Sequence, residues 1–430
     1  MQILYRNIVK REPPADDETA GPTVHACAGM EAKGKVNKRT VQEQARPDCV
    51  DVITDLPAAR SRWEALESEG VATPFQSFTW VSTLANTVGR SLAAETFVVI
   101  VREPSSGRDL LLLPLVRRRL GPARIIELAD LGVSDYSAPI VAPELAAAPD
   151  RLAAIWKRAI TALPPADVIR INKIPDQIGQ RANPLLVIER SWAKETQSWR
   201  INLPDHWADY ETSMLSKKLR GNLRRDLRKL EGFGKVTHVN AADEATTEQI
   251  FDALCAHRVA RFARLRRTNI LDNAAYREFY RQVLRHGLVS GLASISALKV
   301  GDDIVATLLG LRWRGTYFAL IPTMAEGALQ AHGIGKLMNW FEIKEMHARG
   351  CRCFDFTIGN EPYKRDYGAT PRMLYEIVRP LKAKGYPLAW GIKVRASWKR
   401  WAEAAPATTN GVMTVPASVG RIIGRALFRA

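Results

Sequence analysis

A short glycine-containing stretch, residues 330–336, has the composition of a phosphate-binding turn. It reads Q-A-H-G-I-G-K. Residues 316–322 before it are aromatic and β-branched, which predicts a strand, and apolar residues after it recur at helical spacing up to Gly350. Because glycine has no Cβ, the chain can turn tightly there and present backbone N–H groups at a helix N-terminus, where the helix dipole favours an anion. The stretch therefore predicts a diphosphate site.

The spacing Q-x-x-G-x-G in this stretch resembles the acyl-CoA pyrophosphate loop of the GNAT N-acetyltransferase superfamily. A second stretch, residues 353–364, reads as a strand followed by the loop motif G-x-E-P-Y-K. The sequence D-F-x-x-G-x-E-P-Y-K, with G-x-G-K-L-M before it, resembles the CelD-like (BioF-like) acetyltransferases associated with cellulose and exopolysaccharide synthesis. These proteins are GNAT enzymes related to the FemABX peptidyltransferases.

The resemblance implies acetyl-CoA, or another acyl-CoA, as the co-substrate. Backbone N–H groups of the glycine turn would hold the diphosphate. Pro322 removes a hydrogen-bond donor from its strand, so backbone groups near it are expected to bind the thioester carbonyl and the pantetheine arm. The predicted cofactor-binding residues are Ile321, Thr323, Gln330, His332, Gly333, Ile334, Gly335 and Lys336.

Acyl transfer from a thioester to an amine needs a base for the ammonium and an acid for the leaving thiolate. Tyr363 follows the second-half strand, where GNAT enzymes often place such an acid, and packing beside Pro362 is the alternative. The candidates for the base are Asp355, Glu361 and His257. Burial between the flanking phenylalanines would raise the pKa of Asp355 into a useful range, and a structural hydrogen bond is the alternative. Glu361 lies in a loop at a strand end, where functional residues concentrate.

His257 lies on a helix expected at about residues 247–267. The run H-R-x-x-R-F resembles the H-x-x-R-W segment of the same acetyltransferases, which implies an active-site role for His257. A lone helical histidine is otherwise a packed or surface residue. Arg258 lies in this run and Lys364 lies in the G-x-E-P-Y-K motif. We also predict these two residues as acceptor contacts. The helix residues expected to face the core are Phe251, Leu254, Arg258, Phe262 and Leu265.

The same order of elements occurs in both halves of the chain. The first half is expected to hold a helix near 60–69, strands at 96–102, 110–118 and 124–130, a helix at 151–163 and a strand at 167–174. The second half is expected to hold strands at 293–300, 304–313 and 316–322, a helix at 334–350 and a strand at 353–358. Ile174-Pro175 and Glu361-Pro362 fall at matching places. This indicates an internal duplication, and FemABX-like proteins are tandem GNAT-like domains.

The length of 430 residues fits two domains plus tails. The predicted fold class is α/β (α+β), with tandem GNAT-like domains, each a mixed, mostly antiparallel sheet flanked by helices. Residues 1–48 lack apolar periodicity, which predicts a tail without a fixed fold. The predicted domains are 49–204, GNAT-like without a CoA loop, and 205–390, the acetyltransferase domain with the loop. Residues 391–430 form a C-terminal extension.

The first half has no Q-x-x-G-x-G stretch, so we predict one CoA site, in the second half. Asp135 and Tyr136 lie in the first-half loop that corresponds to the glycine turn. We predict that they contact the acceptor in a cleft between the halves. The alternative for these residues is a turn cap, because Asp is a frequent turn former.

The formal net charge of +17 and the isoelectric point near 9.8 predict an anionic partner. CoA, a nucleotide sugar, tRNA and an anionic membrane surface all qualify, whereas DNA is not expected because no DNA-binding signature is present. Residues 216–230 combine a leucine stripe with basic residues on the other helix faces, either a solvated surface or an anion-binding face. They resemble the S-K-K-x-R-x-N-x-R-R linker of the family. The basic tail at 419–429 is either disordered or a membrane contact.

The sequence predicts a cytoplasmic protein without a bound metal. No apolar run approaches the ~18 residues of a membrane span, and no signal-peptide core is expected. The five cysteines show no paired C-x-x-C spacing, so we expect reduced thiols and no zinc.

Three classes of function remain open. The first is an acyl-CoA-dependent N-acyltransferase acting on an amino group of a sugar or polysaccharide precursor. The second is a FemABX-like transferase that uses aminoacyl-tRNA, which the basic surface would suit. The intact Q-x-x-G-x-G favours CoA, because a tRNA donor does not need a diphosphate loop. The third is a non-catalytic accessory protein that contacts the polysaccharide-synthesis machinery.

Overall fold

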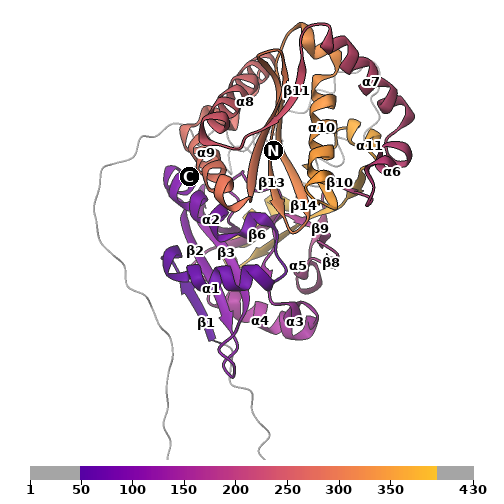
Figure 1. Ribbon diagram of the computed structural model, residues 1–430. Coiled ribbons are helices and arrows are strands. Elements are labelled where there is room, and N and C mark those ends of the chain that lie inside the picture. The colour runs from indigo at the N-terminus through magenta and orange to yellow at the C-terminus, as the bar shows by residue number, and fades with distance from the viewer. Residues whose placement is uncertain (1–48, 395–430) are drawn as a thin grey trace, which may run out of the picture.

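Two sheets, each accompanied by helices, form the folded part of the chain. The structure is a computed structural model that describes residues 49–394. Figure 1 shows the first half of these residues (indigo to magenta) below and the second half (pink to orange) above. The predictions for residues 1–48 and for the basic tail at 419–429 lie outside the described residues.

The first sheet has eight strands in the order β1-β2-β3-β4-β6-β17-β9, with β5 beside β3. Its strands are β1 (Cys49–Ile53), β2 (Glu95–Arg102), β3 (Asp109–Leu120), β4 (Ala123–Leu128), β5 (Ile140–Val141), β6 (Val168–Pro175), β9 (Trp192–Ala193) and β17 (Leu374–Pro380). The helices of this half are α1 (Leu56–Glu69), α2 (Phe78–Leu84), α3 (Pro143–Ala146), α4 (Pro149–Thr161) and α5 (Pro184–Ile188). The elements expected in this half agree with these bounds to within a few residues.

The second sheet has seven strands in the order β11-β12-β13-β14-β15-β10-β16. Its strands are β10 (Ser198–Asn202), β11 (Val236–Asn240), β12 (Ala293–Val300), β13 (Asp303–Trp313), β14 (Thr316–Met324), β15 (Cys353–Ile358) and β16 (Thr370–Arg372). The helices of this half are α6 (Trp207–Asp209), α7 (Lys217–Glu231), α8 (Glu244–Arg264), α9 (Ala274–Ser290), α10 (Ile334–Ala348) and α11 (Tyr363–Asp366). Helix α9 and strand β11 were not expected from the sequence.

The two sheets repeat the same arrangement. In each sheet the fourth and fifth strands are parallel, β4 with β6 and β14 with β15, while the other neighbours along both paths are antiparallel. The fifth strands share a backbone irregularity, because Lys173 of β6 and Thr357 of β15 both have positive φ, 59° and 54°. The predicted tandem of two mixed, mostly antiparallel sheets is confirmed.

The halves exchange one strand each, which the sequence analysis did not foresee. Strand β10 precedes residue 205 but lies in the second sheet, between β15 and β16. Strand β17 comes from the end of the second half but lies in the first sheet, between β6 and β9. The predicted division at residues 204 and 205 therefore does not separate the two sheets.

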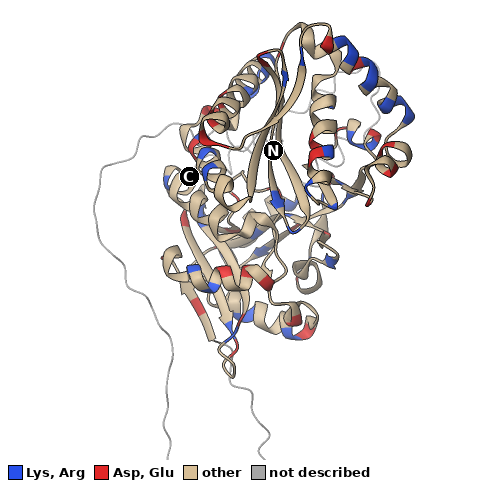
Figure 2. Ribbon diagram, in the orientation of Figure 1, with Lys and Arg blue, Asp and Glu red and all other residues tan. Residues whose placement is uncertain are grey.

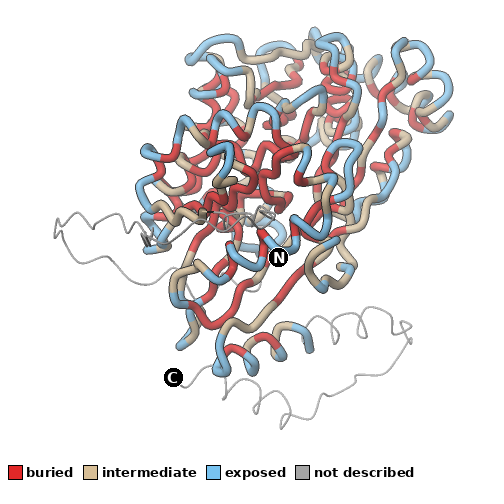
Figure 3. Tube along the Cα trace, turned by 90° about the horizontal axis from the view of Figure 1, so that it is seen from below, coloured by how far each residue is buried: buried red, intermediate tan, exposed pale blue. Residues whose placement is uncertain are grey.

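An apolar core joins the halves. The indole of Trp80 on α2 meets the ring of Phe279 on α9, with centroids 4.8 Å apart, and its Nε1 donates to Ser134 Oγ. Phe75 packs against both Tyr136 and Phe318, at 5.8 and 5.9 Å. Figure 3 shows buried segments (red) running through the middle of the molecule. The halves thus share one continuous core.

Helix α7 has the predicted leucine stripe. Its N-cap Ser216 accepts a hydrogen bond from Leu219 N at 3.1 Å. Leu219, Leu223 and Leu230 are buried against the second sheet and α10. The basic residues of α7 lie along its outer side (Figure 2). On α8, Phe251 and Leu254 are buried as expected, but Leu265 is exposed because the helix ends at Arg264.

Candidate active site

Strands β14 and β15 separate part of the way along their length. They pair in parallel at three positions, from Thr316 with Cys353 to Phe318 with Asp355. Beyond these pairs, β14 has a bulge opposite Leu309 and Gly310. The Thr357 hydroxyl donates to the carbonyl of Ala319 at 3.1 Å. The end of β14, where the sequence predicts contacts with the acyl-CoA arm, thus lies beside an opening in the ladder.

The glycine turn lies directly after β14 and forms the start of α10. Gln330 belongs to a 3₁₀ turn over Ala328–His332, and Gly333 is the residue before the helix, with φ 66° and ψ 27°. This left-handed conformation favours glycine. The strand, turn and helix follow one another as predicted. The Lys336 side chain is exposed, and the His332 ring lies 5.4 Å from that of Phe233.

A buried carboxylate lies against this turn. A Cβ added to Gly333 would come within 2.5 Å of Asp226 Oδ2, and one on Gly335 within 2.8 Å of Met324 Cε. Asp226 is 6% exposed, and its Oδ1 is 3.4 Å from a guanidinium nitrogen of Arg225. Glycine at 333 is therefore required by packing as well as by the backbone conformation. The helix dipole of α10 favours this carboxylate as it would favour a phosphate.

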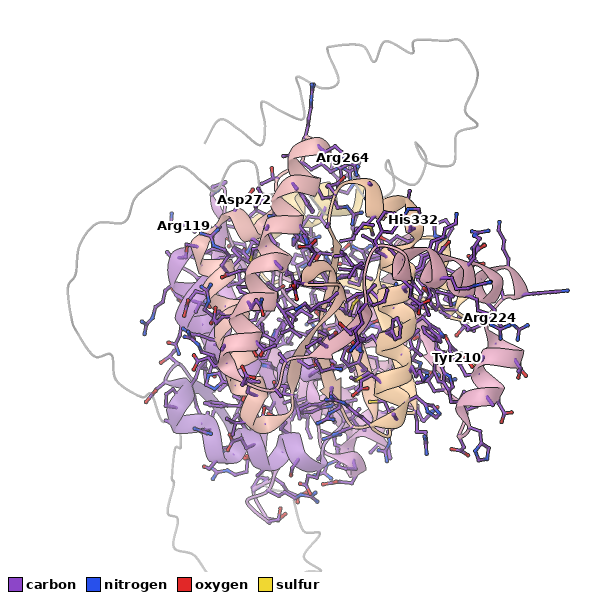
Figure 4. All side chains as sticks on the ribbon, turned by 45° about the horizontal axis from the view of Figure 1, so that its top comes forward. Arg119, Tyr210, Arg224, Arg264, Asp272 and His332 are labelled. Atoms are coloured by element: carbon purple, nitrogen blue, oxygen red, sulfur yellow. The ribbon has the colours of Figure 1, made fainter. Side chains whose placement is uncertain are left out.

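The surroundings of the turn fit an acyl-CoA diphosphate in two respects. The start of α10 carries backbone N–H groups, although the space beside Gly333 and Gly335 is already filled by the side chains of Asp226 and Met324. The basic helix α7 packs against both the turn and α10. Figure 4 shows Arg224 on this helix and His332 at the turn. The Asp226 carboxylate, in contrast, would repel a diphosphate bound at the turn.

A carboxyl group of the second half is paired with a phenol of the first. Asp355 Oδ1 accepts hydrogen bonds from Tyr136 Oη and from Thr357 N, both at 2.7 Å. Asp355 is 7% exposed, and its burial raises its pKa to about 6, although both hydrogen bonds act to lower it. Burial also raises the pKa of Tyr136 well above its ordinary value. A titratable group with a pKa near neutrality thus lies where the halves meet.

The burial of Asp355 does not come from its neighbours in sequence, as the sequence analysis expected. Successive side chains of a strand point to opposite faces. Phe354 and Phe356 therefore pack in the core on the α10 side. Asp355 faces the first half together with Phe318, its partner in the ladder. The aromatic surroundings of this carboxyl are contributed by Tyr136 and Phe318.

Three further predicted residues lie near this pair. Asp135 bonds to the Thr357 side chain, and burial raises its pKa against the influence of Lys173. Lys364 is 2% exposed, and its Nζ donates to the Gly359 carbonyl at 3.1 Å and contacts Glu361 Oε2 at 2.9 Å. Its charge lowers the pKa of both Asp135 and Asp355. Glu361 itself is exposed.

Tyr363, the predicted acid, lies on the α10 side of β15. Its ring contacts those of Phe356 and Tyr367, with centroids 6.0 and 6.3 Å away. Burial raises its pKa to about 12, whereas a hydrogen bond to Asn339 lowers it. Tyr367 Oη donates to the Lys336 carbonyl at 2.7 Å, which ties this segment to the first turn of α10.

His257 and Arg258 point to different neighbours. His257 Nδ1 lies 3.1 Å from Thr323 Oγ1, so this histidine faces the end of β14. Burial lowers its pKa, which leaves the ring neutral at pH 7. Arg258 Nε donates to Asn269 Oδ1 at 3.0 Å, and its guanidinium lies over the Phe262 ring. Arg258 thus holds the loop between α8 and α9, and its predicted acceptor contact stays a prediction.

Some residues at this site were missed by sequence reasoning. Arg200 and Ser198 lie on β10, opposite Asp355 and Ile358. The alternation of buried Trp199 and Ile201 with the more polar residues is the signal that would have identified this strand. The left-handed conformation of Thr357 has no such signal, because β-branched residues rarely adopt it.

Comparisons with known proteins agree with this geometry. Residues 217–365 match the family model described as an acetyltransferase (GNAT) domain. A search of curated protein sequences finds no match. Among solved structures, the chain is similar to FemX, with a TM-score of 0.56 and 11% identity over 76% of this chain and 98% of that one.

Two more distant structures are L-PGS from Bacillus licheniformis and a tandem GNAT protein from the clavulanic acid biosynthesis pathway. L-PGS has a TM-score of 0.47 and 13% identity, over 78% of this chain and 96% of its own. The tandem GNAT protein has a TM-score of 0.42 and 11% identity, over 77% and 98%. The likeness to FemX is one of fold. The chain thus contains a GNAT-type acetyltransferase domain within a FemX-like fold.

The described residues offer neither a cluster of metal ligands nor a helix able to span a membrane. In residues 49–394, no group of three or more His, Cys, Asp and Glu side chains could hold a metal ion. Within the same range no helix combines the length and the apolar character that crossing a membrane requires. The cysteines in this range, Cys49, Cys255, Cys351 and Cys353, are free thiols.

Proposed function

We propose that this protein is an acyl-CoA-dependent N-acyltransferase whose acceptor amine binds between the two halves. The acyl group is acetyl, and the acceptor is an amino group of a sugar or polysaccharide precursor. The observation that carries the proposal is the Tyr136–Asp355 pair beside the separation of β14 and β15, within a GNAT-type domain. The polysaccharide context rests on the CelD-like motif and includes contact with the synthesis machinery or a membrane surface.

Acetyl-CoA, when bound, supplies an activated acyl group. The N–H groups of Ile334 and Gly335 and the backbone of β14 around Ile321–Thr323 are the groups that would hold it, because the N–H groups of Gly333 and Lys336 already donate within the turn. Asp355 then takes the proton of the acceptor ammonium, for which its pKa near 6 is suited at neutral pH. Tyr136 holds this carboxyl in one orientation through its hydroxyl. Tyr363 would donate a proton to the leaving thiolate.

Among the candidates for the base, the surroundings favour Asp355. Glu361 is exposed and paired with Lys364, so its charge is already compensated. His257 is neutral and therefore able to accept a proton, but its Nδ1 is engaged by Thr323. His257 is the second candidate, because it faces the open end of β14.

A second candidate function is a FemABX-like transferase that takes its acyl group from aminoacyl-tRNA. The exposed basic side of α7 and the FemX-like fold favour it. The Asp226 carboxylate beside the glycine turn also favours a donor that does not need a diphosphate site.

Calorimetric titration with acetyl-CoA separates the two candidates. We expect one site per chain, followed by acetyl transfer to amino sugars such as glucosamine in a coupled thiol-release assay. Asp355→Asn serves as the control, because it should bind acetyl-CoA normally and fail to transfer the acetyl group. A chain that binds no acetyl-CoA but accepts an aminoacyl group from tRNA would establish the second function instead.

A further inference from the structure

A pocket between the halves opens directly beside the Tyr136–Asp355 pair. Its volume is about 300 Å³. The first half contributes Tyr136 and the small hairpin of β7 (Gln177–Ile178) and β8 (Arg181–Ala182). The second half contributes the face of its sheet that carries Phe318 and Asp355. The size suits a small polar molecule or one end of a larger one.

Two arginines lie on this face of the second sheet. Arg200 of the exchanged strand β10 is the ladder partner of Asp355, and Arg372 of β16 is the partner of Ser198. Directly paired residues on neighbouring strands point to the same face. Trp199 and Ile201 point the other way, into the core. Arg200, Arg372 and Asp355 thus lie close together along one wall of the pocket.

Three N–H donors at the pocket have no partner among the described residues. They are Nε of Arg200, Nε of Arg372 and Nε1 of Trp313, all buried. Arg200 uses Nη1 for the Gly179 carbonyl at 3.3 Å, and Nη1 of Arg372 lies 3.6 Å from Asp176 Oδ2. Buried donors without partners are rare in folded proteins. Both guanidinium groups thus have hydrogen-bonding capacity beside the pocket that the described residues do not use.

Two other charged groups at the pocket are already engaged. Arg314 donates to the carbonyls of Gly70, Glu67 and Ser68. Glu69 is paired with Arg108 at 3.0 Å. Around Asp355, the groups with unused capacity include the two guanidinium Nε–H groups and the indole N–H, beside the carboxyl itself. They place positive and negative recognition groups side by side.

We infer that the acceptor carries an anionic group, a carboxylate or a phosphate, a short distance from its amine. The anionic group binds Arg200 and Arg372, whose planar guanidinium groups match the oxygens of carboxylates and phosphates. The amine then lies at Asp355, the ladder neighbour of Arg200. This inference rests on the proposed function and names the class of its acceptor. A neutral amine would leave the buried arginine donors without partners.

A matched series of small amines tests the inference by calorimetry at constant ionic strength. The probes are ethanolamine, O-phosphoethanolamine and β-alanine, which share a two-carbon spacing and differ in the second group. We expect the two amines with an anionic group to bind at least tenfold more tightly than ethanolamine. The relative affinities for O-phosphoethanolamine and β-alanine show whether the site prefers phosphate or carboxylate. Equal affinity for all three overturns the inference.

Substitution of each arginine tests whether it causes the tighter binding of the anionic amines. Arg200→Gln and Arg372→Gln should each remove most of the preference for anionic amines, lowering O-phosphoethanolamine affinity roughly ten- to a hundredfold and ethanolamine affinity far less. Arg119→Gln removes the same charge from an exposed position on β3 (Figure 4) and should preserve the preference. Because Arg372 lies on a three-residue edge strand, its variant keeps the test valid if Arg200→Gln does not fold. Variants that retain the full preference contradict the assignment.

Transfer assays with acetyl-CoA distinguish failure of this inference from failure of the proposed function. Acetylation of ethanolamine as efficient as that of the anionic amines leaves the acyltransferase intact and overturns the acceptor class. Arginine-dependent binding of the anionic amines without any acetyl transfer supports the binding site and rejects the acetyl-CoA reaction.

Discussion

Replacing Asp355 with asparagine separates a catalytic from a structural role of this buried carboxyl. The asparagine Oδ1 can accept the same hydrogen bonds from Tyr136 Oη and Thr357 N, so the local geometry is kept. The negative charge and the capacity to take up a proton are lost. If Asp355 is the base, Asp355→Asn should lower kcat by roughly 10²- to 10⁴-fold and leave acetyl-CoA affinity unchanged.

The pH dependence follows from the raised pKa. Because the carboxyl must be ionised to act as a base, kcat/KM of the wild type should fall below about pH 6. The effect on stability is opposite. A carboxyl whose pKa is about 6 folded and 3.8 unfolded stabilises the fold below pH 3.8, and this contribution is lost as the pH rises through 6. At pH 8, Asp355→Asn should therefore raise the free energy of unfolding, by up to about 3 kcal/mol.

Tyr136→Phe is the matched test of the pair. The hydroxyl of Tyr136 lowers the pKa of Asp355 by bonding to its ionised form. A hydrogen bond to a charged group contributes about 1.5–3 kcal/mol, so its removal should move the acidic limb of the profile up by about one to two pH units. The assay is a series of initial rates of thiol release between pH 5 and 9, with thermal unfolding measured on the same samples.

One outcome would refute this reasoning. If Asp355→Asn keeps a near-normal kcat and loses stability at pH 8, the carboxylate is a structural hydrogen-bond acceptor and not the base. His257→Ala, followed by Glu361→Gln, would then be the next variants to assay.

Three further predictions concern the cofactor and the acceptor. Asp226→Asn removes a negative charge beside the glycine turn and should tighten acetyl-CoA binding two- to tenfold in a titration; unchanged affinity would place the diphosphate elsewhere. Tyr363→Phe should lower kcat about 10²-fold without changing acetyl-CoA affinity, and a normal kcat would leave only its packing on Phe356. Asp135→Asn should raise KM for the acceptor roughly tenfold with acetyl-CoA affinity constant, whereas a uniform loss of both would indicate a structural cap.

Local patterns in the sequence were sufficient for much of the fold. The strand, turn and helix around Gly333 depend on contiguous residues, so periodicity and glycine placement predicted them. The correspondence of the halves was also readable, and it led to Asp135 and Tyr136, which lie at the junction of the halves beside Asp355. Their proposed contact with the acceptor remains to be tested.

Features that depend on contacts between residues far apart in the sequence could not be predicted. Strands β10 and β17 have only five and seven residues, and their partners lie far away in the sequence. Without β10, Arg200 could not be placed beside Asp355. The approach of Asp226 to Gly333 likewise depends on how α7 packs across α10. In each case tertiary contacts decide what the local sequence leaves open.

The exchange of strands limits how the two halves can move. Between β16 of one sheet and β17 of the other lies a single residue, Met373, and only residues 194–197 separate β9 from β10. Swinging the halves apart would also expose the apolar core that they share. A ligand therefore enters through the mouth of the pocket and not by opening of a hinge. Any closure over it must come from short surface segments such as the β7–β8 hairpin, which can rearrange without disturbing either ladder.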